Sequence, residues 1–354
     1  MTAMRGPARG AAVVLQAAAM LAACLPLAGE ARAQTETDAS PAYSPPRTAW
    51  GHPDLAGRYT METFTPLERP AHLAGKEFFT EEEAAELQAL LTAEGVDPLA
   101  GNVLALEDEE QRQDRLYQDS DTHYDNSVWL RGNTPKGLST RRTSLIVDPP
   151  DGRIPSRTRE AERAAEDRRE ERRGREFESH LVRPLSERCV VWPHEGPPMV
   201  PPAYNDILEI LQTPDYVVIA PELRTNKPRI IPLNAGPRIS DRIRLFQGDP
   251  RAWWDGDTLV VESTNFTGKT LFRGAATEEL IVIERFTRVD ADTIRYEFTV
   301  DDPRAWTRAW SVEIPMVRRD DPMFEYACHE GNYDVRIILT VNRNLEKQAA
   351  AREQ

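Results

Sequence analysis

The C-terminal half of the chain alternates between apolar and polar residues over short stretches. Alternation at a period of two is typical of β-strands with one buried face. Turns rich in Gly, Asp and Asn separate the stretches. The pattern predicts strands at DYVVIA (215–220), RIIPL (229–233), DTLVVESTNF (257–266), ELIVIERFTRV (279–289), DTIRYEFTV (292–300), AWSVEIPMV (309–317) and DVRIILTV (334–341).

Short polar turns between these strands predict β-hairpins. One turn is centred on Asp255-Gly256-Asp257 and another on Ala291-Asp292, and turns of this composition join adjacent antiparallel strands. The fold class is therefore mainly β, α+β overall. Residues 189–345 are expected to form an antiparallel β-barrel or curved meander, lipocalin-like in style, followed by a disordered tail at 346–354.

Residues 34–188 are expected to be extended and partly helical, with one or two helices. The segment TEEEAAELQALLTAEG predicts a helix in which Thr80 caps the N-terminus and Glu83 completes a capping box. Gly95 ends this helix. Its predicted apolar face consists of Ala84, Leu87, Leu90 and Leu91.

A second, highly charged helix is predicted over 158–180, capped by Thr158. Interleaved Glu and Arg residues at helical spacing stabilise such a segment through neighbouring ion pairs. A solvated spacer helix is favoured over a partner-binding surface. SLIVD (144–148), just before it, predicts a short strand followed by the turn PPDG.

The first 33 residues have the pattern of a secretory signal peptide. Two arginines precede a long apolar run, and ARA at 31–33 is a small-x-small cleavage pattern before Gln34. The expected location is periplasmic or secreted. LAAC at 21–24 supports an alternative, a lipoprotein anchored through Cys24. No later segment has the apolar length of a transmembrane helix.

The net charge argues against one class of partner, and the cysteine count predicts a disulfide. The chain has 44 basic and 58 acidic residues, a net charge of −14, so nucleic acid is not an expected partner. Signal cleavage would leave Cys189 and Cys328, which pair by default in an oxidising compartment. Such a disulfide closes a loop of roughly 140 residues and stabilises by at most about 5 kcal/mol in the chain-entropy model.

The stretch EYACHEGNY (325–333) holds the candidate catalytic residues. His329 with Glu330, or with Glu222, could form an acid–base pair, because His titrates near neutral pH. Tyr333 is the fourth candidate. The alternative is structural: His329 fixes the turn at Gly331 by hydrogen bonding to a carbonyl group.

Candidate ligand-binding residues are Trp254, Arg229, Asn332 and Asn265. Trp at a barrel mouth can flank a ligand, and Arg binds carboxylates through its fork. His194-Glu195 and His329-Glu330 each follow one cysteine of the expected disulfide, which raises the alternative of a shared metal. Adjacent strand residues face opposite sides, so each pair can supply one inward ligand unless a bulge intervenes, and no metal is predicted. No cofactor is predicted either.

Seven motifs resemble those of a widespread family of exported bacterial proteins, from about Trp50 to Asn342. They are WGHPDLAGRY, PLERP followed by AGKEFFT, TSLIVDPPDGRIP, YNDILEILQTPDYVVI, GDPRAWWDGDTLVVESTNF, ERFTRVDADTIRYEFTVDDPRAW and EYACHEGNY. The resemblance implies export but no particular activity. His329 and Glu330 match its pattern and His194 does not. Where the family tends to carry a His after Glu222, this chain has Thr225, Asn226 and Lys227.

Three functions follow from these features. The first is an exported protein that binds a small apolar or aromatic molecule in a β-barrel pocket. The alternative is an envelope enzyme, a hydrolase, lyase or isomerase, that uses His329 and Glu330 for acid–base chemistry. The third is an envelope scaffold protein. Whether the chain is an enzyme is left open.

Overall fold

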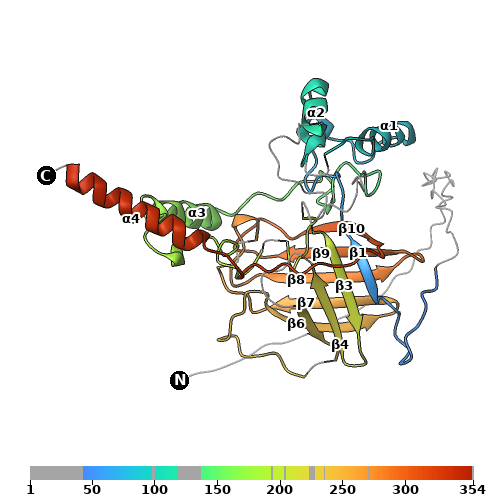
Figure 1. Ribbon diagram of the computed structural model, residues 1–354. Coiled ribbons are helices and arrows are strands. Elements are labelled where there is room, and N and C mark those ends of the chain that lie inside the picture. The colour runs from blue at the N-terminus through green and yellow to red at the C-terminus, as the bar shows by residue number, and fades with distance from the viewer. Residues whose placement is uncertain are drawn as a thin grey trace, which may run out of the picture. The chain divides into compact units, whose positions relative to one another are not determined.

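An antiparallel β-barrel dominates the computed structural model (Figure 1), which describes residues 43–97, 100–117, 137–192, 194–202, 205–222, 228–234, 236–269 and 272–352. Neighbouring strands follow the order β5-β4-β3-β1-β10-β9-β8-β7-β6, and β2 pairs with β10 outside this path. The predicted fold class is confirmed. The strands are β1 (Gly57–Thr60), β2 (Ile146–Asp148), β3 (Ile207–Gln212), β4 (Tyr216–Pro221), β5 (Arg229–Pro232), β6 (Asp249–Asp255), β7 (Thr258–Thr264), β8 (Ile281–Arg288), β9 (Thr293–Asp301) and β10 (Trp310–Arg318).

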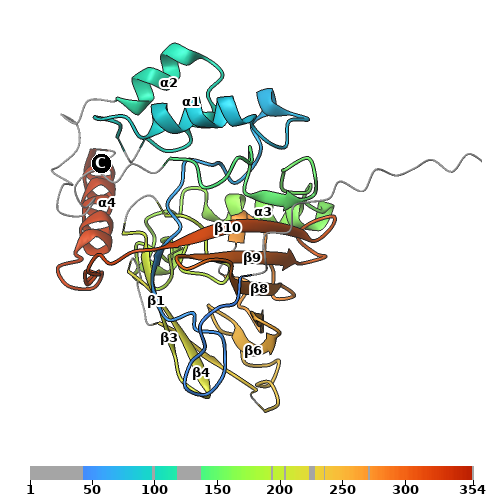
Figure 2. The same cartoon turned by 90° about the vertical axis from the view of Figure 1, so that its right-hand side faces the viewer.

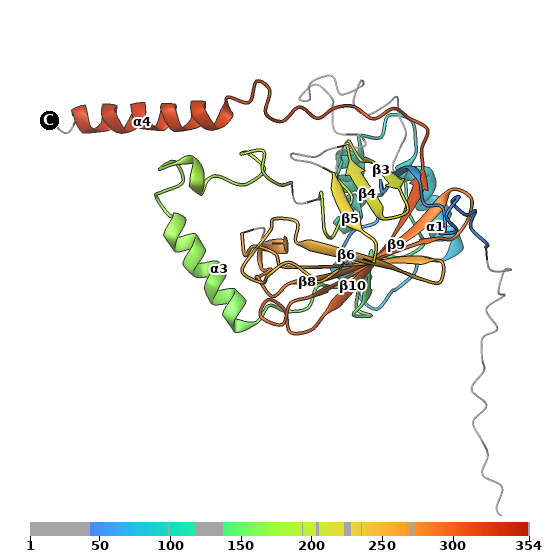
Figure 3. The same ribbon diagram turned by 90° about the horizontal axis from the view of Figure 1, so that it is seen from below.

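The two ends of the sheet approach each other and nearly close the barrel. Figure 3 shows β5 beside β6. A parallel bridge joins Leu233, just after β5, to Ala252 on β6, and the Asn234 N–H donates to the Ala252 carbonyl over 3.1 Å. Closure of this kind removes most of the exposed strand edge that would otherwise pair with other chains.

Strict alternation along β8, β9 and β10 fills the barrel interior with side chains. The inward positions of β9 and β10 are apolar or aromatic and fully buried. The rings of Phe286 and Tyr296 lie 4.9 Å apart, and those of Tyr296 and Phe298 lie 5.7 Å apart. These distances are typical of packed aromatic pairs. The inward residues of these two strands are Ile294, Tyr296, Phe298, Val300, Trp310, Val312, Ile314 and Met316.

The N-terminal region contributes directly to the barrel wall. β1 lies between β3 and β10, with Tyr59 opposite Leu208 on one side and Arg318 on the other. Figure 2 shows β1 between these two strands. β2, which covers the predicted SLIVD strand, pairs with β10. Residues far apart in sequence therefore meet in one sheet.

Four α-helices lie within the described residues: α1 (Glu81–Leu91), α2 (Glu109–Leu116), α3 (Arg159–Arg172) and α4 (Asp334–Arg352). Short 3-10 turns accompany them: η1 (Ala71–Leu73), η2 (Val103–Ala105), η4 (His180–Val182) and η5 (Phe272–Gly274). Around α1, η2 and α2 a second hydrophobic cluster forms, separate from the barrel core. Its buried members are Phe64, Leu91, Val96, Ala100, Val103, Leu104 and Leu116.

Both predicted helix caps are present. The Thr80 side chain accepts from the Glu83 N–H and the Glu83 carboxylate accepts from the Thr80 N–H, which is a complete capping box. Thr158 caps α3 by accepting from the Ala161 N–H over 3.1 Å. α3 ends at Arg172 rather than 180, and the chain turns at Gly174 with φ +73°, a conformation that favours glycine.

The predicted strand at 334–341 is wrong: this segment begins α4. Continuous apolar residues such as Ile337 and Ile338 fit either a buried strand or one face of a helix. The recurrence of Ile337, Val341 and Leu345 every four residues matches the helical period. α4 also takes in 346–352, so that part of the predicted disordered tail is helical.

The predicted signal peptide at 1–33 and the alternative anchor at Cys24 lie outside the described residues. Among the residues that are described, no helix has the length and apolar character needed to cross a membrane.

Candidate functional site

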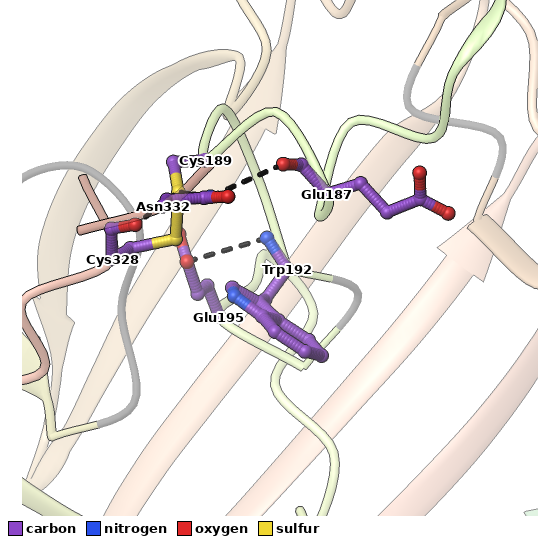
Figure 4. The surroundings of a disulfide bond; sticks show 6 residues. All are labelled: Glu187, Cys189, Trp192, Glu195, Cys328 and Asn332. Carbon is purple, nitrogen blue, oxygen red and sulfur yellow. Dashed lines mark hydrogen bonds between the residues drawn. A yellow bond between two sulfur atoms is a disulfide. The ribbon is translucent and has the colours of Figure 1, made fainter. Parts of the chain in front are cut away.

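The loop that carries EYACHEGNY is fastened to the chain by the Cys189–Cys328 disulfide, with 5.8 Å between the two Cα atoms. Figure 4 shows its surroundings. The Asn332 side-chain amide donates to the Glu187 carbonyl over 3.4 Å and to the Cys189 sulfur over 3.1 Å. The predicted disulfide is therefore present, and Asn332 buttresses it.

The candidate catalytic residues do not share one environment. His329 and Glu330 are exposed, and Tyr333 is 57% exposed at the start of α4. Glu222 is buried, and its carboxylate accepts from the Phe324 N–H over 2.5 Å. A carboxylate placed in this way holds the backbone of the segment that leads to Cys328.

The metal alternative also finds little geometric support. His194 packs against Trp192, with 5.8 Å between ring centroids, and the buried Glu195 accepts from the Trp192 N–H over 3.3 Å. In the described part of the chain, no three His, Cys, Asp or Glu side chains are grouped as metal ligands.

Arg229 belongs to a buried hydrogen-bonded network inside the barrel. Its guanidinium group pairs with both carboxylate oxygens of Glu284, and Nη1 lies 2.9 Å from Oε1. The Tyr296 hydroxyl donates to Glu284 over 2.8 Å and accepts from the Met199 N–H over 2.9 Å. A bidentate Arg–carboxylate pair with further hydrogen bonds is the arrangement that lets two charges remain buried.

Burial and neighbouring charge set the ionisation of this network. Burial raises the pKa of Tyr296 well above its usual value, and the Glu284 carboxylate raises it further. Burial opposes the charge of Arg229, but the attraction of Glu284 holds its pKa above the usual value. The network therefore keeps an ion pair and a neutral phenol in the barrel core.

Trp254 and Asn265 occupy structural positions. The Trp254 ring stacks on His52 at 5.2 Å and packs against the barrel core. Asn265 has a positive φ of 59°, and its amide donates to the carbonyls of Ser240 and Ile243 over 3.2 and 3.3 Å. Asn tolerates this backbone conformation better than most residues. These contacts shape the chain around β6 and β7.

A separate cleft of about 470 Å³ opens beside α1, α2 and η1. Leu87 and Leu90, predicted as part of the apolar face of α1, line it together with the buried Phe79 and Leu104. Leu91, from the same predicted face, is buried in the neighbouring hydrophobic cluster. The remaining lining residues are Leu73 and the polar side chains of His72, Lys76, Glu83, Glu86, Glu109, Arg112 and Gln113.

Two polar features of the cleft matter for binding. The Lys76 ammonium lies 5.8 Å from the centroid of the Phe79 ring and pairs with Glu83. Arg112 donates from Nη2 to the Leu106 carbonyl over 2.6 Å, while its Nε is shielded from water and has no hydrogen-bond partner among the described residues. A shielded N–H without an acceptor costs free energy. The Arg112 side chain as a whole lines the cleft and brings a positive charge to its wall.

Sequence patterns missed this cleft and the partners of Arg229. Few periodic signals mark 101–142, which hid α2 and its Arg112. A signal for Glu284 did exist: it stands at an inward position of β8, between Val282 and Phe286. A charged residue at an apolar position of a strand points to a buried partner.

Comparison of the chain with protein-family models, curated proteins and solved structures found no significant match. The resemblance to a family of exported bacterial proteins therefore stays a prediction. Function has to follow from the geometry and chemistry of this chain's own residues.

Proposed function

We propose that this protein binds a small, mainly apolar molecule that carries a hydrogen-bond acceptor, and that the α1–α2 cleft holds it. The observation that carries this proposal is the apolar surface of Leu87, Leu90 and Phe79 in a cleft that the cationic side chains of Arg112 and Lys76 also line. Ligand sites are typically clefts of roughly 300–1,000 Å³ with apolar walls and a few placed polar groups. The volume of about 470 Å³ falls in this range.

The location differs from the barrel pocket expected from the sequence. Inward side chains such as Phe298 and Trp310 are fully buried, and Arg229 is engaged by Glu284. The cleft offers an apolar surface that solvent and ligand can reach. It therefore supports binding better than the barrel interior does.

The acid–base alternative has weaker support. Glu222 is buried against the Phe324 N–H, whereas His329 and Glu330 are exposed. The binding proposal accordingly ranks first.

Isothermal titration of the purified protein with 1-anilinonaphthalene-8-sulfonate tests the proposal, because this probe joins an apolar aromatic body to an acceptor group. We expect saturable binding at one site. Leu87→Trp should weaken it at least about tenfold by filling the cleft. Arg112→Met should weaken it by roughly 1.5–3 kcal/mol, the usual worth of a hydrogen bond to a charged group.

Two matched variants serve as controls. Leu211→Trp adds the same bulk to a half-exposed site on β3, and Arg169→Met removes an exposed arginine on α3. Neither should change probe binding. Unchanged binding in Leu87→Trp, with thermal unfolding as in the parent protein, would refute the assignment of the cleft.

A further inference from the structure

The α4 helix presents an uncovered apolar stripe. None of its 19 residues is buried, and the helix can be followed in Figure 3. Ile337, Val341 and Leu345 are 53, 50 and 55% exposed. Residues four apart lie on the same side of a helix, so these three form one apolar stripe.

The opposite side of α4 is basic. Arg336, Arg343 and Lys347 are spaced by seven and four residues, which places them together and away from the stripe. Arg343 donates to the Glu178 carbonyl, and Arg336 lies over the Tyr333 ring. In the described part of the chain none of the three pairs with a carboxylate. This cationic surface contrasts with the chain's net charge of −14.

The start of α4 is anchored, and its apolar stripe is exposed. Cys328, six residues before the helix, is bonded to Cys189, and Asn332 is tied to the Glu187 carbonyl. The helix therefore starts from an anchored point. Its apolar stripe is not needed for packing within the described structure.

A second copy of α4 is a poor partner for this stripe. In a coiled coil, Ile338, Val341 and Leu345 would form the seam, and Gln348 and Arg352 would follow at the next two seam positions. The apolar seam would thus end after three positions, whereas stable coiled coils repeat it over several heptads. The cationic side instead favours an anionic partner.

We propose that α4 lies on a lipid surface that carries anionic headgroups. A helix with an apolar side and a Lys/Arg-rich polar side binds in the plane of the membrane interface, with its apolar side at the acyl boundary. Each basic residue near an anionic surface strengthens binding about fivefold. α4, about 28 Å long at the usual rise per residue, offers three such residues and an apolar stripe of about two and a half turns.

Vesicle co-sedimentation of the full chain tests this proposal. We expect binding to phosphatidylcholine vesicles that contain phosphatidylglycerol and much weaker binding to phosphatidylcholine alone, with added salt reducing the former. Replacing Arg336, Arg343 and Lys347 by Gln should reduce binding at least about tenfold, towards the hundredfold limit for three charges. Replacing Ile337, Val341 and Leu345 by Gln should reduce it at least as much.

The control removes the same charge from another exposed helix. Replacing Arg159, Arg163 and Arg169 on α3 by Gln should leave vesicle binding within about twofold. Because no α4 residue is buried, both α4 variants should fold. Failure of the parent protein to bind, equal loss in the α3 variant, or lipid-free dimers that vanish when the apolar stripe is replaced would each overturn the proposal; the last would assign the stripe to a second copy.

Discussion

At the scale of single residues, the barrel core depends on one polar network. Glu284 accepts from Arg229 and from Tyr296, and Tyr296 accepts from the Met199 N–H. Every member is buried, so removal of one leaves another without its partner. Removing one member of such a network costs more folding free energy than replacing the whole network by apolar side chains. Arg229 is thereby a structural group in the barrel.

Tyr296→Phe should destabilise the protein by about 1–3 kcal/mol at neutral pH, because the Met199 N–H loses its acceptor and Glu284 loses a donor. The pKa of Tyr296 is raised in the folded state. The stability due to this raised pKa is fully present below about pH 10, the unfolded value, and is lost as pH rises towards the folded pKa. The expected loss is about 1.4 kcal/mol per pH unit above pH 10.

Urea unfolding of the parent protein and the variant between about pH 9 and 11 measures both effects. The gap between the two proteins should narrow above pH 10, since the variant lacks this titration. Tyr216→Phe, at an exposed position on β4, is the control and should alter neither the stability nor its slope. A constant gap across the range would contradict a raised pKa in the folded state.

At the scale of elements, the strands with clear alternation of apolar and polar residues were predicted correctly. The strands β4, β5, β7, β8, β9 and β10 follow the predicted alternation, and the hairpin at Asp255-Gly256-Asp257 joins β6 to β7 as expected. Short elements cannot be predicted in this way. The four residues of β1, GRYT, are too few to establish an alternation of apolar and polar residues. The strand prediction fails for α4 because five of the seven residues at 335–341 are apolar, three of them in a row, a pattern that fits a strand or a helix.

Thr158→Ala tests the local origin of α3. The variant loses the hydrogen bond from the Ala161 N–H and the one that the Thr158 hydroxyl donates to the Arg304 carbonyl. It should destabilise α3 by about 1 kcal/mol. Amide hydrogen exchange should speed up by about fivefold across 159–172. The barrel strands should be unaffected, and equal acceleration in β9 would show that α3 and the barrel open together. Thr92→Ala, at the C-terminal end of α1, is a comparison that should leave α3 unchanged.

At the scale of the whole molecule, long-range contacts join distant segments of the described chain. β1 pairs with β10, and the disulfide joins Cys189 to Cys328, 139 residues apart. The chain-entropy model assigns such a loop about 5 kcal/mol. Cys328 follows the last barrel strand, however, so the bond restrains the connection to α4 as well as the barrel.

Replacement of Cys189 and Cys328 by Ser should therefore lower the free energy of unfolding by less than about 5 kcal/mol. The segment between β10 and α4 should lose protection first, because it would then be held only by noncovalent contacts such as those of Phe324 with Glu222 and of Asn332 with Glu187. Urea unfolding combined with limited proteolysis measures both. A full loss of barrel folding would show that the bond is required for the fold itself.

The sequence by itself determined the fold class, the strands with clear alternation, two hairpin turns, two helix caps and the cysteine pair. Each of these depends on residues that are close in sequence or on a count of residue types, so a local pattern suffices. For the cysteine pair, the compartment implied by the N-terminus left one pairing. Local residue preferences for strands, turns and helix caps constrain such features strongly.

Only the tertiary structure decided which distant residues meet. Arg229 on β5 and Glu284 on β8 meet because both side chains point into the interior of a nearly closed barrel. The α1–α2 cleft exists because Leu87 and Leu90 lie beside Arg112 of another helix. His329 is exposed although it neighbours the disulfide. Contacts between segments far apart depend on register and closure, which no local period encodes.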